Sequence, residues 1–299
     1  MEQIPLRCSL HCLLVLSQHT YIGSPEFELR LLKTSPLEGT FAVGGRAPTC
    51  TCRFKTLGRT ALRGNFFGGL MELSRVEMVI GPKAVEKLNA ARVAVIGLGG
   101  VGSYVAEALC RTGVGSFVIM DNDTVEASNI NRQLPALTST IGKFKADVMA
   151  ARLRDINPLC RIRVIKDFYR PGDFETLFVD GFDFIADAID STESKADLLI
   201  EAYRHNVPVV SAMGTGNKLH PEMLEITDIS KTSVCPLARS MRKKLRDAGI
   251  TEGITVVYSH EEPQRFIEGS VPGSLVFVPA CAGMMMAAHI VQKIIAGQD

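Results

Sequence analysis

RVAVIGLGGVGSYVAEALCRTGVGSFVIMD, residues 92–121, is the stretch of sequence that decides the fold. It contains an apolar strand pattern, a glycine-rich turn, a helical pattern and a second apolar strand, in the order of a βαβ unit. Gly113 stands where the C-cap of the helix is expected. The stretch therefore predicts a Rossmann-like parallel sheet.

Further elements continue this alternation toward the C-terminus, with a loop-rich tract between the last two helices. The predicted strands are 161–165, 183–189, 207–213 and 223–229, and the predicted helices are 143–156, 171–179, 192–205, 236–247 and about 280–296. The strands before 214 are interpreted as apolar runs rather than alternations, as expected when helices cover both faces of a parallel sheet. We predict an α/β fold with a mostly parallel sheet, helices on both faces and a C-terminal antiparallel extension.

Residues 1–70 differ from the rest of the chain. They contain four of the eight cysteines, eight Lys and Arg against four Asp and Glu, and no sustained helix or strand period. A helical pattern, MELSRVEMVIGPKAVEKL, begins abruptly at Met71. We predict that Met71 is the biological start and that residues 1–70 are disordered or a non-native extension. Sequencing the N-terminus of the native protein tests this.

The composition limits which binding partners and which cellular compartment are expected for this protein. A formal net charge of +1 gives no whole-molecule attraction for nucleic acid or membranes, so a nucleic-acid partner needs a local basic patch. No C-x-x-C pair occurs, which disfavours a structural zinc site, and the cysteines fit a reducing cytoplasm best. The closing helix carries His289, Gln292 and Lys293, so no membrane span is expected.

The glycine-rich turn predicts a nucleotide site. Its glycines form G-x-G-G-x-G between a strand and a helix, where bare amides and the helix N-terminus face a phosphate: Gly97, Gly99, Gly100 and Gly102. Asp121 ends the next strand, where a carboxylate can accept from ribose hydroxyls. NAD enzymes and ATP-using adenylating enzymes share this motif, so it does not identify the chemistry.

The stretch after Asp121, DNDTVEASNINRQ, favours ATP over NAD. It gathers polar side chains that hydride transfer does not need: Asp123, Asn129, Asn131, Arg132 and Gln133. A triphosphate does need them, because charge develops on the α-phosphate as pyrophosphate leaves and an arginine can hold such oxygens. Lys145 opens the next predicted helix and is interpreted as a phosphate ligand, whereas Lys143 is interpreted as solvated.

Two aspartates follow the fourth predicted strand, at the sheet edge where such folds bind ligands. Asp190 is the predicted Mg²⁺ ligand, since Mg²⁺ prefers one or two carboxylates together with phosphate oxygens. The alternative for Asp190 is a helix N-terminal acid, and Asp187 is open to a purely structural interpretation as a backbone hydrogen-bond acceptor.

Five motifs occur in a fixed order along the chain: GLGGVG, the Asp121 strand end, NINRQ, GKFKA and DAIDS. In these motifs the sequence resembles the superfamily of ubiquitin-activating-type adenylating enzymes, over about residues 72–299. The resemblance implies an ATP-binding adenylation domain at 71–299, with a nucleotide core at about 90–215 and a substrate and dimer extension at about 216–299. It also implies ATP at the glycine loop, Asp121 and Asp123, phosphate contacts from Asn129, Arg132 and Lys145, and magnesium at Asp190. Arg75 looks like the family's arginine that reaches the partner's site in a homodimer.

Within the superfamily the chain is similar to the tRNA threonylcarbamoyladenosine dehydratases, notably in TDISKTSVCPLARSMRKKLR and PGSLVFVPACAG. This branch implies ATP-dependent adenylation of the threonyl carboxylate in tRNA, then closure of a ring with loss of water. A sulfur-relay protein is a further partner to expect. The alternatives are adenylation of a ubiquitin-like or sulfur-carrier C-terminus, against which the missing zinc cysteines argue, and a non-catalytic or NAD-binding module.

The segment from 230 to 248 leaves two interpretations open. Cys235 is a candidate thiol nucleophile, but intramolecular ring closure needs none and no nearby histidine would lower its pKa. A basic helix follows, and it is interpreted either as a contact for the tRNA backbone or as a solvated face: Arg239, Arg242, Lys243, Lys244 and Arg246.

Overall fold

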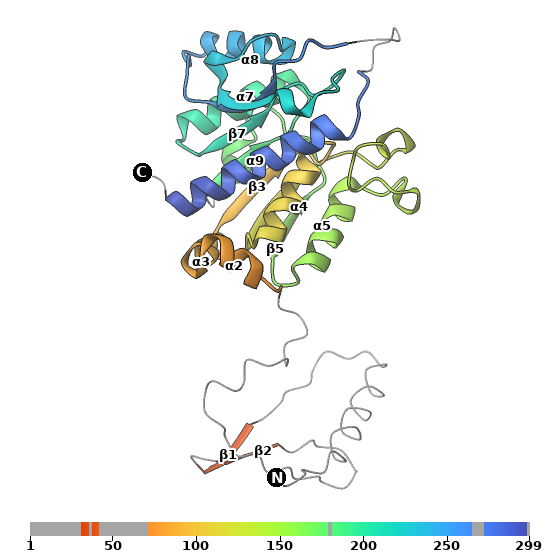
Figure 1. Ribbon diagram of the computed structural model, residues 1–299. Coiled ribbons are helices and arrows are strands. Elements are labelled where there is room, and N and C mark those ends of the chain that lie inside the picture. The colour runs from red at the N-terminus through yellow and green to blue at the C-terminus, as the bar shows by residue number, and fades with distance from the viewer. Residues whose placement is uncertain (1–30, 36–37, 42–70, 179–180, 265–271, 298–299) are drawn as a thin grey trace. The chain divides into compact units, whose positions relative to one another are not determined.

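The computed structural model describes residues 31–35, 38–41, 71–178, 181–264 and 272–297 (Figure 1). The chain divides into two compact units, residues 1–66 and 67–299. In the first unit β1 (Leu31–Ser35) pairs with β2 (Glu38–Phe41) in antiparallel fashion. The sequence predicts no regular element there, so this strand pair is a difference, although two strands alone are marginally stable.

The second unit is built on a seven-stranded sheet in the order β5-β4-β3-β6-β7-β9-β8. The strands are β3 (Arg92–Ile96), β4 (Ser116–Met120), β5 (Arg161–Ile165), β6 (Phe184–Asp187), β7 (Val209–Ala212), β8 (Leu224–Asp228) and β9 (Thr255–Ser259). All are parallel except β8, which runs antiparallel to β9. The strand order reverses between β3 and β6, which is where a doubly wound sheet opens a ligand crevice.

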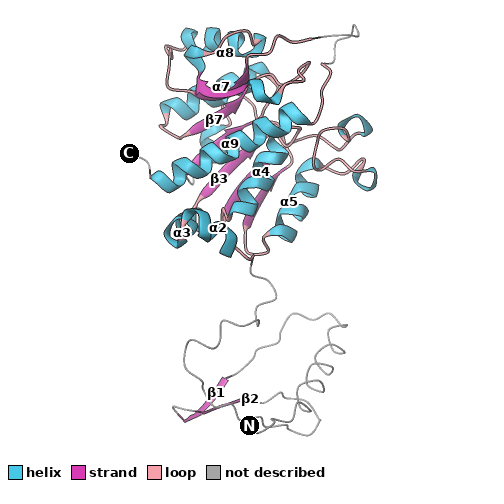
Figure 2. Cartoon of the chain, in the orientation of Figure 1, coloured by secondary structure: helices cyan, strands magenta, loops and turns pink. Residues whose placement is uncertain are grey.

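Helices cover both faces of the sheet, as predicted (Figure 2). They are α2 (Ser74–Ile80), α3 (Pro82–Ala90), α4 (Gly102–Thr112), α5 (Lys145–Ile156), α6 (Phe174–Phe178), α7 (Thr192–Arg204), α8 (Pro236–Asp247) and α9 (Phe277–Ala296). On β3, Val93 and Val95 belong to the apolar cluster with α3, α4, α5 and α9. Ala94 and Ile96 belong to the cluster with α6, α7 and α8. Successive side chains of β3 point to opposite faces of the sheet, so this one strand contributes to both apolar clusters.

The structure corrects the predicted elements in three places. The tract at 248–272 contains β9, which is buried between β7 and β8. The helical pattern after Met71 is two helices, because Gly81 has a φ of +81° and Pro82 begins α3. The closing helix α9 begins at Phe277 rather than near residue 280.

Within the described part of the chain, α9 is the one helix long and apolar enough to cross a membrane by length and composition alone. It packs along α4 and buries seven residues in the core, including Ala282 and Met286. A buried core helix of a globular domain has this same composition, so α9 is explained by the fold.

Candidate functional site

A cavity of about 460 Å³ opens at the carboxyl ends of β3, β4, β6 and β7. This is the switch point of the sheet, where the fold is expected to bind its ligand. Eight of the predicted site residues line it: Gly97, Gly99, Gly100, Asp121, Asp123, Arg132, Lys145 and Asp190. Four separate stretches of sequence therefore meet in one cavity.

The glycine loop is shaped by close backbone contacts. A Cβ at Gly97, whose φ is +89°, would lie 2.6 Å from the carbonyl oxygen of Ala188. A Cβ at Gly102 would lie 1.8 Å from the carbonyl oxygen of Gly97. Gly102 does not line the cavity, so its role is to let α4 begin directly beneath the loop. The amides at the start of α4 are thereby brought to the cavity.

Asp121 ties the glycine loop to the end of β4. Its carboxylate accepts hydrogen bonds from the backbone N–H groups of Leu98 at 2.7 Å and Asp123 at 2.8 Å. Burial raises the pKa of Asp121, and the two amides and nearby Lys145 counteract that rise. Each carboxylate oxygen has a second lone pair, so the predicted ribose contact remains chemically open.

Lys145 is the first residue of α5, and it lines the cavity. Its side chain is 7% exposed, and its Nζ lies 2.7 Å from Oδ2 of Asp123, whose side chain is 56% exposed. The backbone repeats the link, because Lys145 N–H donates to the carbonyl of Asp123 at 2.9 Å. An ammonium group carries three donors, so two stay available for a ligand.

Arg132 is held on two sides. Its Nη1 donates to the carbonyl of Ser128 at 2.9 Å and to Oδ1 of Asn131 at 2.8 Å. Its stem packs against the glycine loop, since a Cβ at Gly100 would lie 3.4 Å from Cγ of Arg132. Among the described residues no acceptor pairs with its Nε or Nη2, which leaves one edge of the guanidinium free for an anion.

The two aspartates after the fourth predicted strand have different surroundings. Asp190 is exposed, lines the cavity and forms no ion pair with any described residue. Asp187 is fully buried and pairs with Lys195 at 2.6 Å, while Ser211 Oγ donates to it at 2.5 Å. Asp187 also accepts from the N–H of Ile189 at 3.0 Å. It is therefore part of the core, and only Asp190 is available as a ligand.

Two further predicted residues lie away from the cavity lining. The amide of Asn129 is turned back on its own turn, accepting from Glu126 N–H at 3.1 Å and donating to Ser128 Oγ at 3.3 Å. Arg75 is exposed on α2, and Leu73, just before α2, packs at Gly113, which caps the far end of α4 (Figure 1). The phosphate contact of Asn129 and the role of Arg75 across a dimer stay predictions.

The sequence analysis did not identify three parts of the cavity wall. Asp167, Phe168 and Tyr169 follow β5, and the segments 213–216 and 272–274 close the other side. Gln133, noted in the polar stretch, has the one buried side-chain oxygen without a partner among the described residues, its Oε1. A buried acceptor without a partner is costly, so a ligand donor at this point of the wall is expected.

The structure shows the surroundings of Cys235 and the partners of each cation on the basic helix. Cys235 is buried at the start of α8, and its Sγ lies 3.5 Å from the Cβ position of Gly214, which lines the cavity. In α8, Arg242 donates to the carbonyl of Thr232 and Lys244 pairs with Glu193 at 2.6 Å. The three other cations, Arg239, Lys243 and Arg246, are exposed and form no ion pair with a described residue.

Comparison with known proteins gives consistent results. A sequence profile of the ThiF family matches residues 73–298. The tRNA threonylcarbamoyladenosine dehydratase of Bacillus subtilis is 40% identical over 242 residues, which is 76% of this chain and 95% of that protein. Crystal structures of the Escherichia coli tRNA N6-threonylcarbamoyladenosine dehydratase with ATP and with AMP both align with a TM-score of 0.71 and 36% identity, covering 74% of this chain and 93% of theirs.

Proposed function

The chain belongs to the ThiF family, and we propose that it is an ATP-dependent tRNA threonylcarbamoyladenosine dehydratase. The threonyl carboxylate of the modified adenosine attacks the α-phosphorus of ATP, and pyrophosphate leaves. The carbamoyl group then attacks the activated carbonyl and displaces AMP, closing a ring. The sum is loss of one water with no change of oxidation state. Activation is needed because a carboxylate has no good leaving group.

The predicted site residues that line the cavity have distinct roles in the proposed reaction. The glycine loop and the start of α4 hold phosphate oxygens with backbone N–H groups. Arg132 and Lys145 oppose the charge that develops on the α-phosphate and on the leaving pyrophosphate. Asp121 orders the loop and offers its remaining lone pairs to ribose hydroxyls. The observation that carries the proposal is the convergence of loop, arginine, lysine and free aspartate on one cavity.

Magnesium fits the donor set at this site. The described residues contain no group of three or more His, Cys, Asp or Glu that could hold a metal by themselves. Mg²⁺ does not require such a cage, because it is held by one or two carboxylates and by phosphate oxygens. Asp190 would be that carboxylate. When bound, the ion would neutralise part of the phosphate charge.

The tRNA is proposed to reach the cavity along α8. Leu237 of this helix lines the cavity, and at 3.6 residues per turn Arg239, Lys243 and Arg246 fall within about 60° of one another on its outer side. Cations without protein partners are the ones that can neutralise phosphates. A homodimer with Arg75 acting in trans, a sulfur-relay partner and a cytoplasmic location are part of the same proposal.

The decisive experiment is mass spectrometry of nucleosides from tRNA carrying threonylcarbamoyladenosine, incubated with the protein, ATP and Mg²⁺. A product lighter by one water, formed only with ATP, is expected. Omitting ATP and substituting Lys145→Met are the controls. An unchanged nucleoside, together with ATP–pyrophosphate exchange driven by the C-terminus of a carrier protein, would instead support the carrier-activating alternative. An NAD-binding module would give neither signal.

A further inference from the structure

Part of the cavity wall is formed by a strap, which we define as Pro272–Ser274. It lies far in sequence from every nucleotide-binding motif, yet both of its sides are held by asparagines. On one side the N–H of Asn217 donates to the carbonyl of Gly273 at 2.7 Å, and the N–H of Gly273 donates to Oδ1 of Asn217 at 2.7 Å. The strap is therefore fixed at this side by a reciprocal pair of hydrogen bonds.

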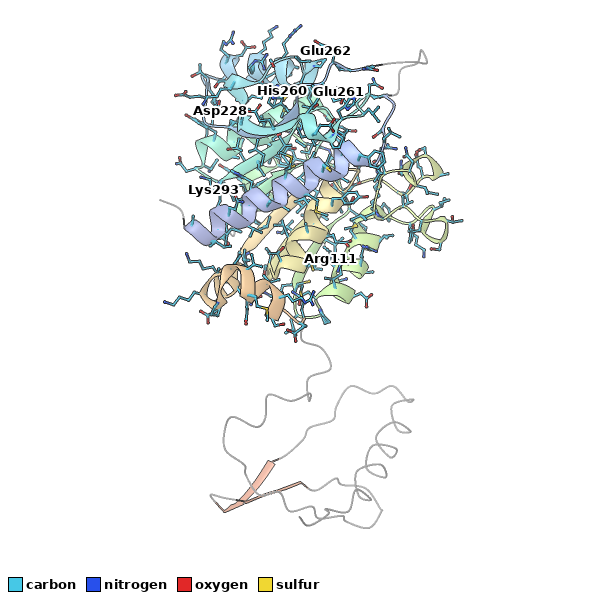
Figure 3. The ribbon with its side chains drawn as sticks, viewed as in Figure 1. Arg111, Asp228, His260, Glu261, Glu262 and Lys293 are labelled. Carbon is cyan, nitrogen blue, oxygen red and sulfur yellow. The ribbon has the colours of Figure 1, made fainter. Side chains whose placement is uncertain are left out.

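Asn217 is itself placed firmly. It has a φ of +59°, in the left-handed region that asparagine tolerates better than most residues. The two residues after it are held as well, since Lys218 Nζ donates to the carbonyl of Ser259 and Leu219 N–H donates to Glu261 at 2.8 Å. Glu261 follows the end of β9, where Figure 3 labels it beside His260. The strap is thus anchored to the sheet.

On the other side the strap meets the phosphate-binding region through Asn131. Its Nδ2 donates to the carbonyl of Ser274 at 2.8 Å, while its Oδ1 accepts from Nη1 of Arg132 at 2.8 Å. The orientation of the amide is unambiguous, because a guanidinium only donates and a carbonyl only accepts. One side chain therefore joins the strap to the arginine.

We propose that Asn131 is a positioning residue that couples the strap to Arg132, so that this part of the cavity wall sets the orientation of the phosphate-binding guanidinium. The chain of contacts runs from Asn217 through Gly273, Ser274 and Asn131 to Arg132. The inference rests on the ATP-binding half of the proposed function, and it adds that disturbing the strap disturbs phosphate binding. Asn217 does not itself line the cavity, so its effect on the nucleotide is expected to pass through this chain.

A double-mutant cycle tests the coupling. Asn217→Gly keeps the positive φ and the N–H donor but removes the Oδ1 acceptor, and Asn131→Ala removes both amide contacts. Each should weaken ATP binding about 3- to 10-fold in the native background and less than about 2-fold when Arg132 is already Ala. ATP affinity is measured by calorimetry with Mg²⁺, and the unfolding midpoint of every variant is measured alongside.

Asn206→Gly is the matched control, because Asn206 also has a positive φ, +52°, and does not line this cavity. It should leave ATP affinity unchanged. Equal losses for Asn217→Gly in the native and Arg132→Ala backgrounds would overturn the coupling. Since ATP binding needs no tRNA, a coupled cycle without dehydration of tRNA would refute the proposed substrate alone. A chain that binds no ATP would refute both.

Discussion

Two lysine–aspartate pairs lie at the same edge of the sheet, and they differ in what surrounds them. Lys195 and Asp187 are 2.6 Å apart with both side chains fully buried. Lys145 and Asp123 are 2.7 Å apart, with Asp123 more than half exposed and the cavity beside them. The buried Nζ also donates to Ser211 and to the carbonyl of Ala212, whereas Lys145 has one acceptor.

The number of hydrogen bonds that each lysine makes within the protein distinguishes a structural lysine from one that can bind a ligand. An ammonium group has three donors. Lys195 uses all three within the protein and joins β6, β7 and α7, so it contributes to stability. Lys145 has no second side-chain acceptor among the described residues and keeps two donors for a ligand, which supports its proposed role in phosphate binding. The same lysine–aspartate pair can therefore stabilise the core or bind a ligand. Which of the two it does depends on how many N–H donors lack a protein acceptor and on whether the pair reaches the cavity.

The largest effect is expected from the buried pair. Lys195→Met leaves Asp187 buried without its cation, which costs about 3–5 kcal/mol of unfolding free energy. Denaturant unfolding measures the loss, with Lys145→Met as the matched substitution at the accessible pair. Adding Asp187→Leu removes the second charge and should recover much of the stability. A loss below about 1 kcal/mol would contradict a stabilising role for the buried pair.

The accessible pair should show the opposite pattern. Lys145→Met removes a phosphate donor and should lower turnover about 10²- to 10³-fold, the usual cost of one well-placed donor. Stability should change by less than about 1 kcal/mol, because a pair with an exposed partner contributes little. Single-turnover dehydration and denaturant unfolding are measured on the same sample. Unchanged turnover would place Lys145 with the structural lysine.

The aspartates sharpen the comparison, since Asp187 and Asp190 are three residues apart. Asp190→Asn should raise the Mg²⁺ concentration for half-maximal turnover about tenfold, the effect of roughly 1.4 kcal/mol from one lost charge-assisted contact. Its unfolding free energy should stay unchanged. Asp187→Asn, in contrast, should lower stability and leave the Mg²⁺ titration in place. An unshifted titration for Asp190→Asn would leave this aspartate as a helix N-terminal acid.

The smallest effect is expected on α8, where neighbouring lysines differ in their partners and in their exposure. Lys244 is paired with Glu193, and Lys243 is exposed without a described partner. Lys243→Ala should reduce the salt dependence of tRNA binding by about 0.7–0.9 in log–log slope, the value for one lost phosphate contact. Lys244→Ala should leave the slope unchanged. Equal slopes for both variants would make α8 a solvated face.

The sequence is most informative where the residues of one site lie close together along the chain. The glycine loop, Asp121, Arg132 and Lys145 follow one another along the first half of the sheet, so their order and spacing predicted the nucleotide wall. Within residues 92–213 the predicted strand bounds agree with the structure to within about two residues, because the four inner strands are buried apolar runs. The edge strand β5, RIRVI, is only partly buried and alternates Arg with Ile or Val.

Contacts between distant segments could not be predicted in this way. Asn131 meets Ser274 across 143 positions, and no local pattern marks such a pair. Lys195 looks like an ordinary helix lysine until α7 is packed against β7. The strand β9 was missed although TVVYS is rich in β-branched residues, because Pro263, Pro272 and Pro279 after it suggested a loop-rich tract. A search for short β-branched runs would have found it.

The wall that the strap and Pro279 add to the cavity has a consequence for synthesis of the protein. The Cβ of Pro279 lies 3.3 Å from the Cβ position of Gly100, so the glycine loop is covered by a residue that is synthesised long after the loop itself. A ribosome-bound chain that has reached residue 250 already contains every nucleotide motif but lacks this cover. The protein therefore acquires this side of the cavity only after α9 has been synthesised.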